Sequence, residues 1–471
     1  MKNICIVLFL LLAQITLAQS RLVTYSAPKG AELKSDYTVK VRTTGKEWKT
    51  VDTYAVKVYK NSDGGTVEKA SMGYFDFEGE VEVAVTSNNE NVKSVIVRPL
   101  SYDIKTKIQG NTVIFKLDKP SNLSVETNGD IFHNLHLFAN PLETYRLGKK
   151  DIYFAPGIHQ LLGDTMMVKS GQTVYIAGGA IVRGTIKVNG VSNVKVLGRG
   201  EIHPVGRGEG IYVSNSRNIK VEGIVTTQCP VGGSYGVEIS NVKSISSYGW
   251  GDGMNVFASS NVYYDGVFCR NSDDCSTVYA TRKGFVGGCK NITMVNSTLW
   301  ADVAHPIFIG LHGNVEHPDT IDGVTYRNID ILDECEKQID YQGCMAINSG
   351  DNNLVRNVTF ENIRIEDIRQ GQLLDMRISF NHKYCKAPGR GIENIFFKDV
   401  TYNGNNAEIS IISGYDDSRK IKNVRFENLR INNTLINDDM AGKPKWYKTG
   451  DMARIFIGEH VDNVTFNAKA K

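Results

Sequence analysis

The sequence lacks any long apolar run beyond its first 19 residues: no later stretch reaches the roughly 18 apolar residues that a membrane-spanning helix needs. It also lacks a basic run, and its net charge of +3 comes from 54 Lys and Arg residues against 51 Asp and Glu residues. Without such runs there is no signature of nucleic-acid binding. We therefore expect no membrane span and no nucleic-acid partner.

Cysteine is scarce. The chain has eight, and because Cys5 lies in the leader, seven remain after it. An odd number in an exported protein requires at least one free thiol or an intermolecular bond. Cys335 and Cys344 are spaced for a disulfide that clasps a loop. None of the spacings resembles a zinc site, so we predict no metal and no cofactor.

Residues 1–19 have the composition of a secretory signal peptide. Lys2 supplies a positive start, Ile4 to Leu12 form a short apolar segment, and Thr16-Leu17-Ala18 offers a small-residue cleavage site. The apolar segment is too short to cross a bilayer. The sequence thus predicts a soluble protein that is secreted or periplasmic.

Short alternating segments separated by turn residues fill the chain from residue 20 to residue 142. Tyr37 to Thr43 and Val81 to Val85 alternate apolar and polar residues, and Leu135 to Pro141 reads as the last strand. Helical patterns are few, and glycine accounts for 45 of 471 residues. This rhythm predicts an all-β chain that begins with a β-sandwich over residues 20–142.

A different unit recurs over residues 143–471: Asn, then Ile or Val, then any residue, then usually an apolar one. Gly323 replaces Asn in one copy, and the Asn copies start at Asn193, Asn218, Asn241, Asn261, Asn291, Asn357, Asn394, Asn423 and Asn463. Repeats of this length with about three strands each indicate a right-handed parallel β-helix rather than a second sandwich or a propeller. We expect each Asn at a bend, where its side chain bonds backbone groups or forms an amide ladder.

Three aspartates are spaced by one such repeat. Asp252 lies between two glycines, 21 residues before Asp273 and 22 before Asp274. Stacked strands are about 4.8 Å apart, so one coil would bring the three carboxyl groups together. Neighbouring residues in a strand face opposite ways, so we expect a bend at Asp273-Asp274. Such a cluster suits cleavage of a glycosidic bond, which needs an acid and a water-activating base.

Further residues are candidates for substrate binding. His305 follows Asp274 by 31 residues and is expected on the next coil, where it could orient an acid or hold a sugar hydroxyl. Arg282 and Lys283 lie in an insertion over residues 280–288 beside the predicted cleft. The remaining candidates are Trp250, which could stack on a sugar ring, His312, and Arg377 for a charged substrate group.

The segments around these residues resemble the polygalacturonase family, glycoside hydrolase family 28. The resemblance rests on Asp252-Gly253, Asn271-Ser272-Asp273-Asp274-Cys275 and His305 to Gly310. The chain is also similar to family 49, the dextranase and isopullulanase family, which combines an N-terminal β-sandwich with a β-helix. There the segments concerned are Val95 to Ser101, Ile152 to Gly157 and Tyr175 to Ala180.

The resemblance implies an inverting glycosidase acting on a polysaccharide or oligosaccharide. Asp273 would be the general acid, and Asp252 and Asp274 the bases that activate water. Three departures leave the substrate open between a dextranase-like glucan and an acidic glycan. Gly-His-Gly of the polygalacturonases is Ala304-His305-Pro306 here, their Arg-Ile-Lys is Arg377-Ile378-Ser379, and Ala-Ile-Lys of family 49 is Cys275-Ser276-Thr277.

Two other classes of protein fit the repeat pattern. A polysaccharide lyase would use Lys283 or Arg282 as the base, often with calcium held by carboxylates. A non-catalytic carbohydrate-binding solenoid would bind glycans without releasing reducing ends. An unsaturated product that absorbs ultraviolet light would identify the lyase, and binding without cleavage would identify the solenoid.

Overall fold

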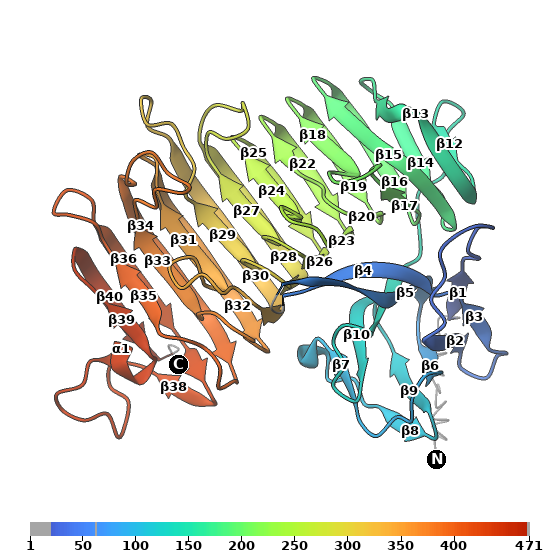
Figure 1. The fold of residues 1–471 in the computed structure, drawn as a ribbon, viewed down its shortest axis with the longest axis horizontal. Coiled ribbons are helices and arrows are strands. Elements are labelled where there is room, and N and C mark those ends of the chain that lie inside the picture. Colours follow the sequence, from blue (N-terminus) through green and yellow to red (C-terminus); the bar gives the residue numbers. More distant parts are fainter. Residues whose placement is uncertain (1–19, 62–63, 469–471) are drawn as a thin grey trace, which may run out of the picture.

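The computed structural model describes residues 20–61 and 64–468, and the predicted signal peptide lies outside these residues. Strands dominate the described chain, in one 29-stranded sheet and two smaller sheets (Figure 1). The only regular helical segments in these ranges are the turn η1 (Leu100–Tyr102) and α1 (Thr449–Met452). No helix in the described part is long and apolar enough to cross a membrane. The prediction of an all-β chain is confirmed.

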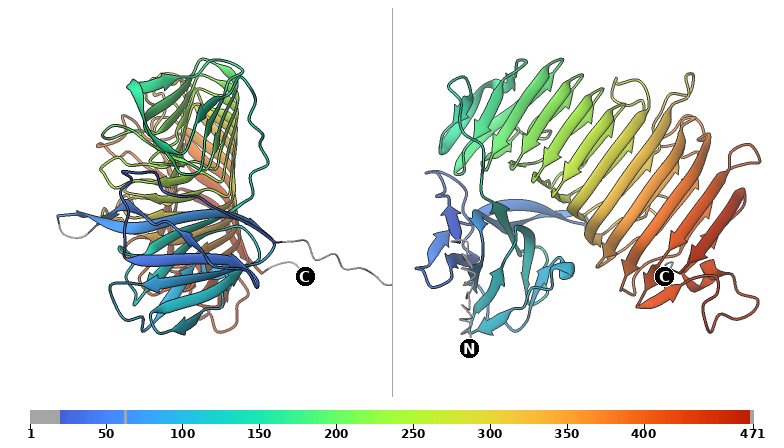
Figure 2. Two further views of the ribbon diagram at one scale, coloured as in Figure 1. Left: turned by 90° about the vertical axis from the view of Figure 1, so that its right-hand side faces the viewer. Right: turned by 180° about the vertical axis from the view of Figure 1, so that it is seen from behind.

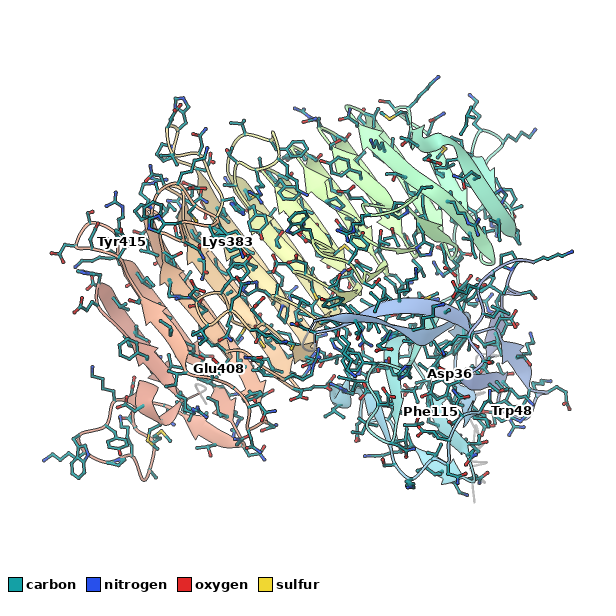
Figure 3. The ribbon with its side chains drawn as sticks, in the orientation of Figure 1. Asp36, Trp48, Phe115, Lys383, Glu408 and Tyr415 are labelled. Atoms are coloured by element: carbon teal, nitrogen blue, oxygen red, sulfur yellow. The ribbon has the colours of Figure 1, made fainter. Side chains whose placement is uncertain are left out.

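The two smaller sheets face each other and form the N-terminal sandwich. One consists of β1 (Arg21–Thr24), β4 (Tyr54–Lys60), β5 (Thr66–Glu78), β7 (Val95–Arg98), β10 (Ser121–Thr127) and β11 (Leu135–Pro141). The other consists of β2 (Tyr37–Thr43), β3 (Lys49–Val51), β6 (Val81–Ser87), β8 (Lys107–Gln109) and β9 (Thr112–Leu117). Alternate residues of both sheets pack into one core, among them Val83, Leu137 and Phe115. Figure 3 labels Phe115.

The large sheet is a parallel β-helix, in which each coil contributes strands to three stacks (Figures 1 and 2). The first stack contains β12 (Ile152–Phe154), β14 (Thr173–Ile176), β16 (Ser192–Gly198), β19 (Arg217–Glu222), β22 (Tyr235–Ser240), β25 (Ser260–Asp265), β28 (Cys289–Ala301), β30 (Thr320–Glu334), β32 (Leu354–Ile365), β34 (Gly391–Tyr402), β36 (Ile421–Glu427) and β40 (Val461–Asn467). Four long strands of this stack, β28, β30, β32 and β34, bend and continue into the third stack.

The second stack contains β13 (Gly157–Met167), β15 (Ala180–Asn189), β18 (Ile211–Ser214), β21 (Val231–Gly232), β24 (Met254–Phe257), β27 (Ser276–Tyr279), β29 (Ile307–Gly310), β31 (Met345–Ser349), β33 (Leu374–Ile378), β35 (Ser410–Ser413) and β39 (Ile455–Ile457). The third adds β17 (Glu201–His203), β20 (Val225–Thr226), β23 (Lys243–Ile245), β26 (Phe268–Asn271) and β37 (Leu429–Ile431), the last paired with β38 (Thr434–Ile436).

The repeated asparagines adopt left-handed backbone angles at one corner of the coil, with φ of 52–62° for the nine predicted copies and 75° for Gly323. Their amides form the predicted ladder: Asn291 Nδ2 donates to Asn261 Oδ1 at 2.9 Å, and Asn463 Nδ2 to Asn423 Oδ1 at 3.0 Å. Asn241 is the exception, because Gly236 occupies its coil's position opposite Asn218. Asn241 begins the next corner instead and bonds Asn140 of the sandwich at 3.1 Å.

Aromatic rings stack inside the β-helix along the first stack of strands. Phe360, Phe397, Phe426 and Phe466 follow one another with ring centroids 4.9, 4.7 and 4.6 Å apart and interplanar angles of 5–10°. All four are buried, with exposed fractions of 0–2 %. The coil register places equivalent side chains directly over one another, so these rings fill the interior of the C-terminal coils.

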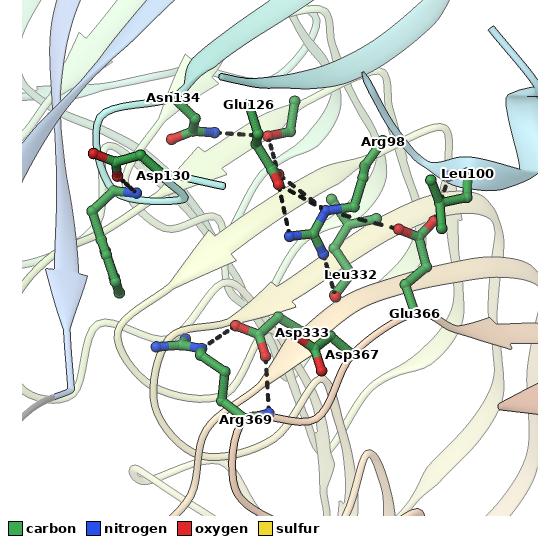
Figure 4. A network of polar contacts seen from close by, with 12 residues as sticks. Arg98, Leu100, Glu126, Asp130, Asn134, Leu332, Asp333, Glu366, Asp367 and Arg369 are labelled. Carbon is green, nitrogen blue, oxygen red and sulfur yellow. Dashed lines mark hydrogen bonds and ion pairs between the residues drawn. The ribbon is translucent and has the colours of Figure 1, made fainter. Parts of the chain in front are cut away.

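Buried charges join the sandwich to the β-helix. Arg98 of β7 pairs with Glu126 at 3.0 Å and donates from Nη1 to the carbonyl oxygen of Leu332 in β30 at 2.8 Å (Figure 4). Glu366, on the β-helix, lies 3.9 Å from Arg98 Nε, and burial raises the pKa of its carboxyl to about 7. Buried ions are costly unless they are paired. Separating the two units would therefore remove the contacts of Arg98 with Glu366 and with the carbonyl oxygen of Leu332.

The hairpin of β4 and β5 extends from the sandwich along the β-helix (Figure 1). Near its tip, Asn61 Nδ2 donates a hydrogen bond to the carbonyl oxygen of Cys335 at 2.9 Å. Cys335 begins the segment between β30 and β31, which we call the 335–344 loop. A side chain of the N-terminal unit therefore holds the start of a loop that belongs to the β-helix.

Replacing Phe397 by Ala should lower the midpoint of chemical denaturation strongly. Removal of a buried phenyl ring and the cavity left behind cost about 3–5 kcal/mol. The control is Phe396→Ala, since Phe396 is half-buried on the other face of the strand, with Arg425 5.0 Å from its ring. Equal losses in the two variants, measured by urea denaturation, would contradict the interior stack.

Candidate active site

Three turns on successive coils carry the predicted aspartates and His305. Asp252 lies two residues before β24, Asp274 two before β27 and His305 two before β29, and Met254, Ser276 and Ile307 are paired in register. Gly253 N donates to the carbonyl oxygen of Asp274 at 2.8 Å, which fixes the two turns one coil apart. The chain leaves the strand geometry at residues 272–275, so the bend predicted at the aspartate pair is confirmed.

The three carboxyl groups open into one cavity of about 340 Å³, which we call the aspartate cavity. Glycine at 253 makes this close approach possible, because a Cβ there would lie 2.5 Å from both Asn271 Oδ1 and the carbonyl oxygen of Cys275. Four of the predicted substrate-binding residues line the same cavity: Trp250, Arg282, Lys283 and His312. His305 and Arg377 do not.

Asp274 is held by three hydrogen-bond donors. Tyr279 donates its hydroxyl to Oδ2 at 2.9 Å, and Oδ1 lies 3.2 Å from the backbone nitrogen and 2.7 Å from Nδ1 of His305. Burial, and after it the charge of Asp252, raise the pKa of Asp274 well above its usual range, and the bonds from Tyr279 and His305 oppose that shift. Donors to both oxygens favour the ionised carboxylate.

Asp273 has a different environment. Its Oδ1 accepts one hydrogen bond, from the backbone N–H of Asp274 at 3.0 Å. Burial raises the pKa of Asp273 well above its usual range, and the charges of Asp252 and Asp274 raise it further. Asp273 therefore has fewer hydrogen-bond donors to stabilise its charged form than Asp274 has.

Asp252 is stabilised by a neighbour on β24, the strand that follows it. Asn255 donates from Nδ2 to Asp252 Oδ2 at 2.6 Å, and Thr277 in turn donates to Asn255 Oδ1 at 2.7 Å. Burial raises the pKa of Asp252, while the Asn255 bond and the positive charges of Lys283 and Arg282 lower it. The two cations thus oppose the effect of burial at the edge of the cavity.

His305 lies behind Asp274 and is fully buried, with an exposed fraction of 0 %. Its ring stacks on Phe308 at 4.3 Å and meets the edge of Tyr341 at 4.5 Å. Burial lowers the pKa of His305 to about 4, so near neutral pH the neutral imidazole donates its Nδ1 proton to Asp274. Of its two predicted roles, this position fits the orientation of a carboxyl group and not contact with a sugar hydroxyl.

Arg377 is engaged elsewhere. Its guanidinium forms a two-bond ion pair with Asp375, at 2.7 Å for each bond, and donates to the carbonyl oxygen of Asp340 at 2.6 Å. The prediction that Arg377 grips a charged substrate group therefore does not match its position. Instead, the side chain ties the 335–344 loop to β33.

The other predicted residues are accessible from the cavity. Trp250 is 83 % exposed, and its backbone is held in the left-handed region at φ 59°. Lys283 lies 5.5 Å from the ring centre of Phe257, and Arg282 Nη1 lies 3.3 Å from His312 Nδ1. Burial lowers the pKa of His312 to about 3, so its neutral ring can accept that hydrogen bond.

Sequence reasoning missed the contribution of two loops. Glu336, Gln338 and Tyr341 reach the cavity from the 335–344 loop, and Tyr384 reaches it from the loop after β33. Tyr341 stacks on Tyr384 at 5.0 Å, which joins the two loops. The sequence signals that could have indicated this contribution were Glu336 and Tyr341, an acidic residue and a tyrosine in the segment between two strands. The predicted disulfide is absent: Cys335 and Cys344 are free thiols, and Cys344 Sγ bonds Glu334 at 3.3 Å.

Comparisons with known proteins agree with this architecture. Dex49A from Penicillium minioluteum has a TM-score of 0.53 at 12% identity, covering 94% of this chain and 96% of its own. The family 28 exopolygalacturonase of Yersinia enterocolitica has a TM-score of 0.46 at 11% identity, covering 84% and 98%. At such identities the likeness to Dex49A shows the fold alone. No curated protein sequence matches this chain.

A family match carries the assignment further. Residues 164–442 match the model of the glycosyl hydrolases family 28, a segment that contains all three aspartates and more than half of the 471 residues. This match favours hydrolysis over the lyase and over the non-catalytic solenoid. The chain belongs to glycosyl hydrolases family 28 and is an O-glycosyl hydrolase built on a parallel β-helix.

Proposed function

We propose that the protein is an inverting glycosidase with Asp273 as the general acid and Asp252 and Asp274 as the bases. The observation that carries this proposal is the unequal hydrogen bonding of two adjacent carboxyl groups. Asp274 accepts three hydrogen bonds, whereas Asp273 accepts one. Donors that stabilise the charged form of one carboxyl group more than that of its neighbour favour the first as the base and the second as the acid.

The proposed reaction follows from this assignment of one acid and two bases. Asp273 gives its proton to the glycosidic oxygen as the bond to the anomeric carbon breaks. Asp252 and Asp274 remove a proton from a water molecule that attacks the same carbon from the opposite face, which inverts its configuration. Tyr279 and His305 hold Asp274 in place and do not contact the reacting atoms themselves.

For the substrate, we propose a neutral sugar at the point of cleavage, as in a dextranase-like enzyme acting on a polysaccharide. Trp250 offers an exposed ring for stacking, and the cavity contains a fourth carboxylate, Glu336, which would repel a uronate. Arg377, the one remnant of the uronate-binding segment of polygalacturonases, is paired with Asp375. Arg282 and Lys283 at the edge of the cavity keep an acidic glycan as the second candidate.

We further propose that the enzyme is exported and has two units. Residues 1–19 would be the signal peptide, residues 20–142 the sandwich and residues 143–471 the catalytic β-helix. The assignment of strands to sheets supports this division, because β1 to β11 form the two smaller sheets and the large sheet starts with β12 at Ile152. Mass spectrometry of the exported protein would locate its first residue.

Replacing Asp273 by Asn should lower kcat about 10²- to 10⁴-fold, the usual contribution of a general acid. Activity is measured by release of reducing ends from dextran, pullulan, polygalacturonate and sulfated algal glycans, with NMR of the first product to identify its anomer. Asp118→Asn, at an exposed site on the sandwich, is the control. Turnover of Asp273→Asn within about twofold of the unmodified enzyme, or a retained anomeric configuration, would refute the mechanism.

Replacing Tyr279 by Phe should move the acidic limb of the pH–kcat/KM profile to higher pH. The lost hydroxyl stabilises the charged form of Asp274, so the pKa of Asp274 rises and the base is protonated at a higher pH. Tyr326→Phe is the matched control, because its hydroxyl bonds Ser276 at 2.9 Å inside the β-helix. A profile that falls in height without a shift of its acidic limb would count against Asp274 as a base.

A further inference from the structure

A second cavity adjoins the aspartate cavity. It has a volume of about 550 Å³, and Arg282, Lys283, His312 and Tyr384 line both cavities. Beyond these shared residues, Asn314, Asp351 and Lys386 contribute to its wall. We call it the basic cavity. The shared residues make the two cavities neighbours at one side of the site.

The two cavities differ in charge. Four carboxyl groups and two cations line the aspartate cavity, whereas three cations, Arg282, Lys283 and Lys386, face two carboxylates in the basic cavity. One of those two, Asp351, is 7 % exposed, and its Oδ1 accepts the backbone N–H groups of Lys386 at 2.6 Å and Ala387 at 3.3 Å. The other, Glu316, is exposed. The sign of the net charge of the lining residues therefore reverses between the two cavities.

The cations are held by contacts that leave donors available. Arg282 uses Nη1 toward His312, and a guanidinium has five N–H donors in total. Lys283 lies over the Phe257 ring, and Lys386 is exposed while its backbone is fixed by Asp351. Cations whose backbones and side chains are partly fixed lose less conformational freedom on binding an anion.

Glu336 makes the aspartate cavity selective in the opposite sense. It is 3 % exposed, and its Oε1 accepts the backbone N–H of Gln338 at 2.7 Å. A carboxylate fixed in this way accepts hydrogen bonds from sugar hydroxyls. It repels a uronate at the same position, where low dielectric strengthens the repulsion.

We propose that the basic cavity is a subsite for an anionic sugar residue, carrying a carboxylate or a sulfate ester, next to a neutral sugar held at the aspartates. The natural glycan would thus combine neutral and anionic residues, and neither dextran nor polygalacturonate would be its best ligand. This inference rests on the proposed function for the order of sugars along the cleft. Binding to the basic cavity can be measured without hydrolysis.

The test uses the full chain carrying Asp273→Asn, so that binding is measured without turnover. Isothermal titration compares two matched pairs of oligosaccharides: carrageenan fragments before and after desulfation, and xanthan fragments before and after reduction of their carboxyl groups. Dextran oligosaccharides provide the neutral reference. We expect the anionic member of one pair to bind about tenfold more tightly, as for one or two charge-assisted hydrogen bonds.

Lys386→Gln should remove most of that preference, since Lys386 lines only the basic cavity. Lys445→Gln, at an exposed lysine that lines neither cavity, should leave it intact. Preference within the carrageenan pair identifies a sulfate subsite, and preference within the xanthan pair a carboxylate subsite. Equal affinities within both pairs, no binding of any probe, or an unchanged preference in Lys386→Gln would each overturn the proposal.

Glu336→Gln provides the complementary measurement. In the Asp273→Asn background, it should raise the affinity for polygalacturonate oligosaccharides about tenfold by removing a like charge from the cleavage position. An unchanged or weaker affinity would overturn the assignment of Glu336 as the residue that excludes uronates. Because neither titration depends on catalysis, these results are separate from the fate of the acid and base assignments.

Discussion

Hydrogen bonds between successive coils of the β-helix set the level of the side chains that form the aspartate cavity's column. In a parallel stack each strand repeats the position of the one before it, at a separation of about 4.8 Å. The bonds from Gly253 to Asp274 and from Cys275 N to the carbonyl oxygen of His305, both 2.8 Å, carry that register through the turns. Asp252, Asp274 and His305 consequently occupy one column, although they are far apart in the sequence.

That column also determines the electrostatics of the site. Aligned carboxyl groups repel one another, and burial strengthens the repulsion because little water screens it. The protein compensates unevenly: Asp274 receives Tyr279 and His305 as donors, and Asp252 receives Asn255. The least compensated group is Asp273, which accepts one hydrogen bond from a backbone N–H. Three chemically identical side chains thus acquire different hydrogen-bonding environments from their neighbours.

Periodicity made much of this architecture predictable. The Asn repeats and the interval from Asp252 to Asp274 reflect a constraint that acts at every coil, so the sequence displays it many times. Asn241 is a position where the repeat pattern gives the wrong corner. Its segment matches the pattern, but it lies at a different corner of the coil from Asn218. Pattern alone could not separate two corners that both favour left-handed asparagine.

The loops were not predictable in this way. Glu336, Tyr341 and Tyr384 reach the cavity because of how two irregular segments fold back, and no repeat encodes such a path. The position of Arg377 was missed for another reason: Asp375, two residues earlier on β33, binds its guanidinium. Spacing suggested a disulfide between Cys335 and Cys344, yet each thiol is buried and free.

The contact between Asn61 and Cys335 restricts how the two units of this enzyme can be recombined during evolution. The sandwich hairpin anchors the start of the loop that brings Glu336 to the aspartate cavity, and Arg199 on the β-helix pairs with Asp76 of the sandwich, 3.0 Å away. A recombination event that exchanged the N-terminal unit would remove both the anchor and the counter-charge. The two units are therefore expected to descend together rather than as interchangeable modules.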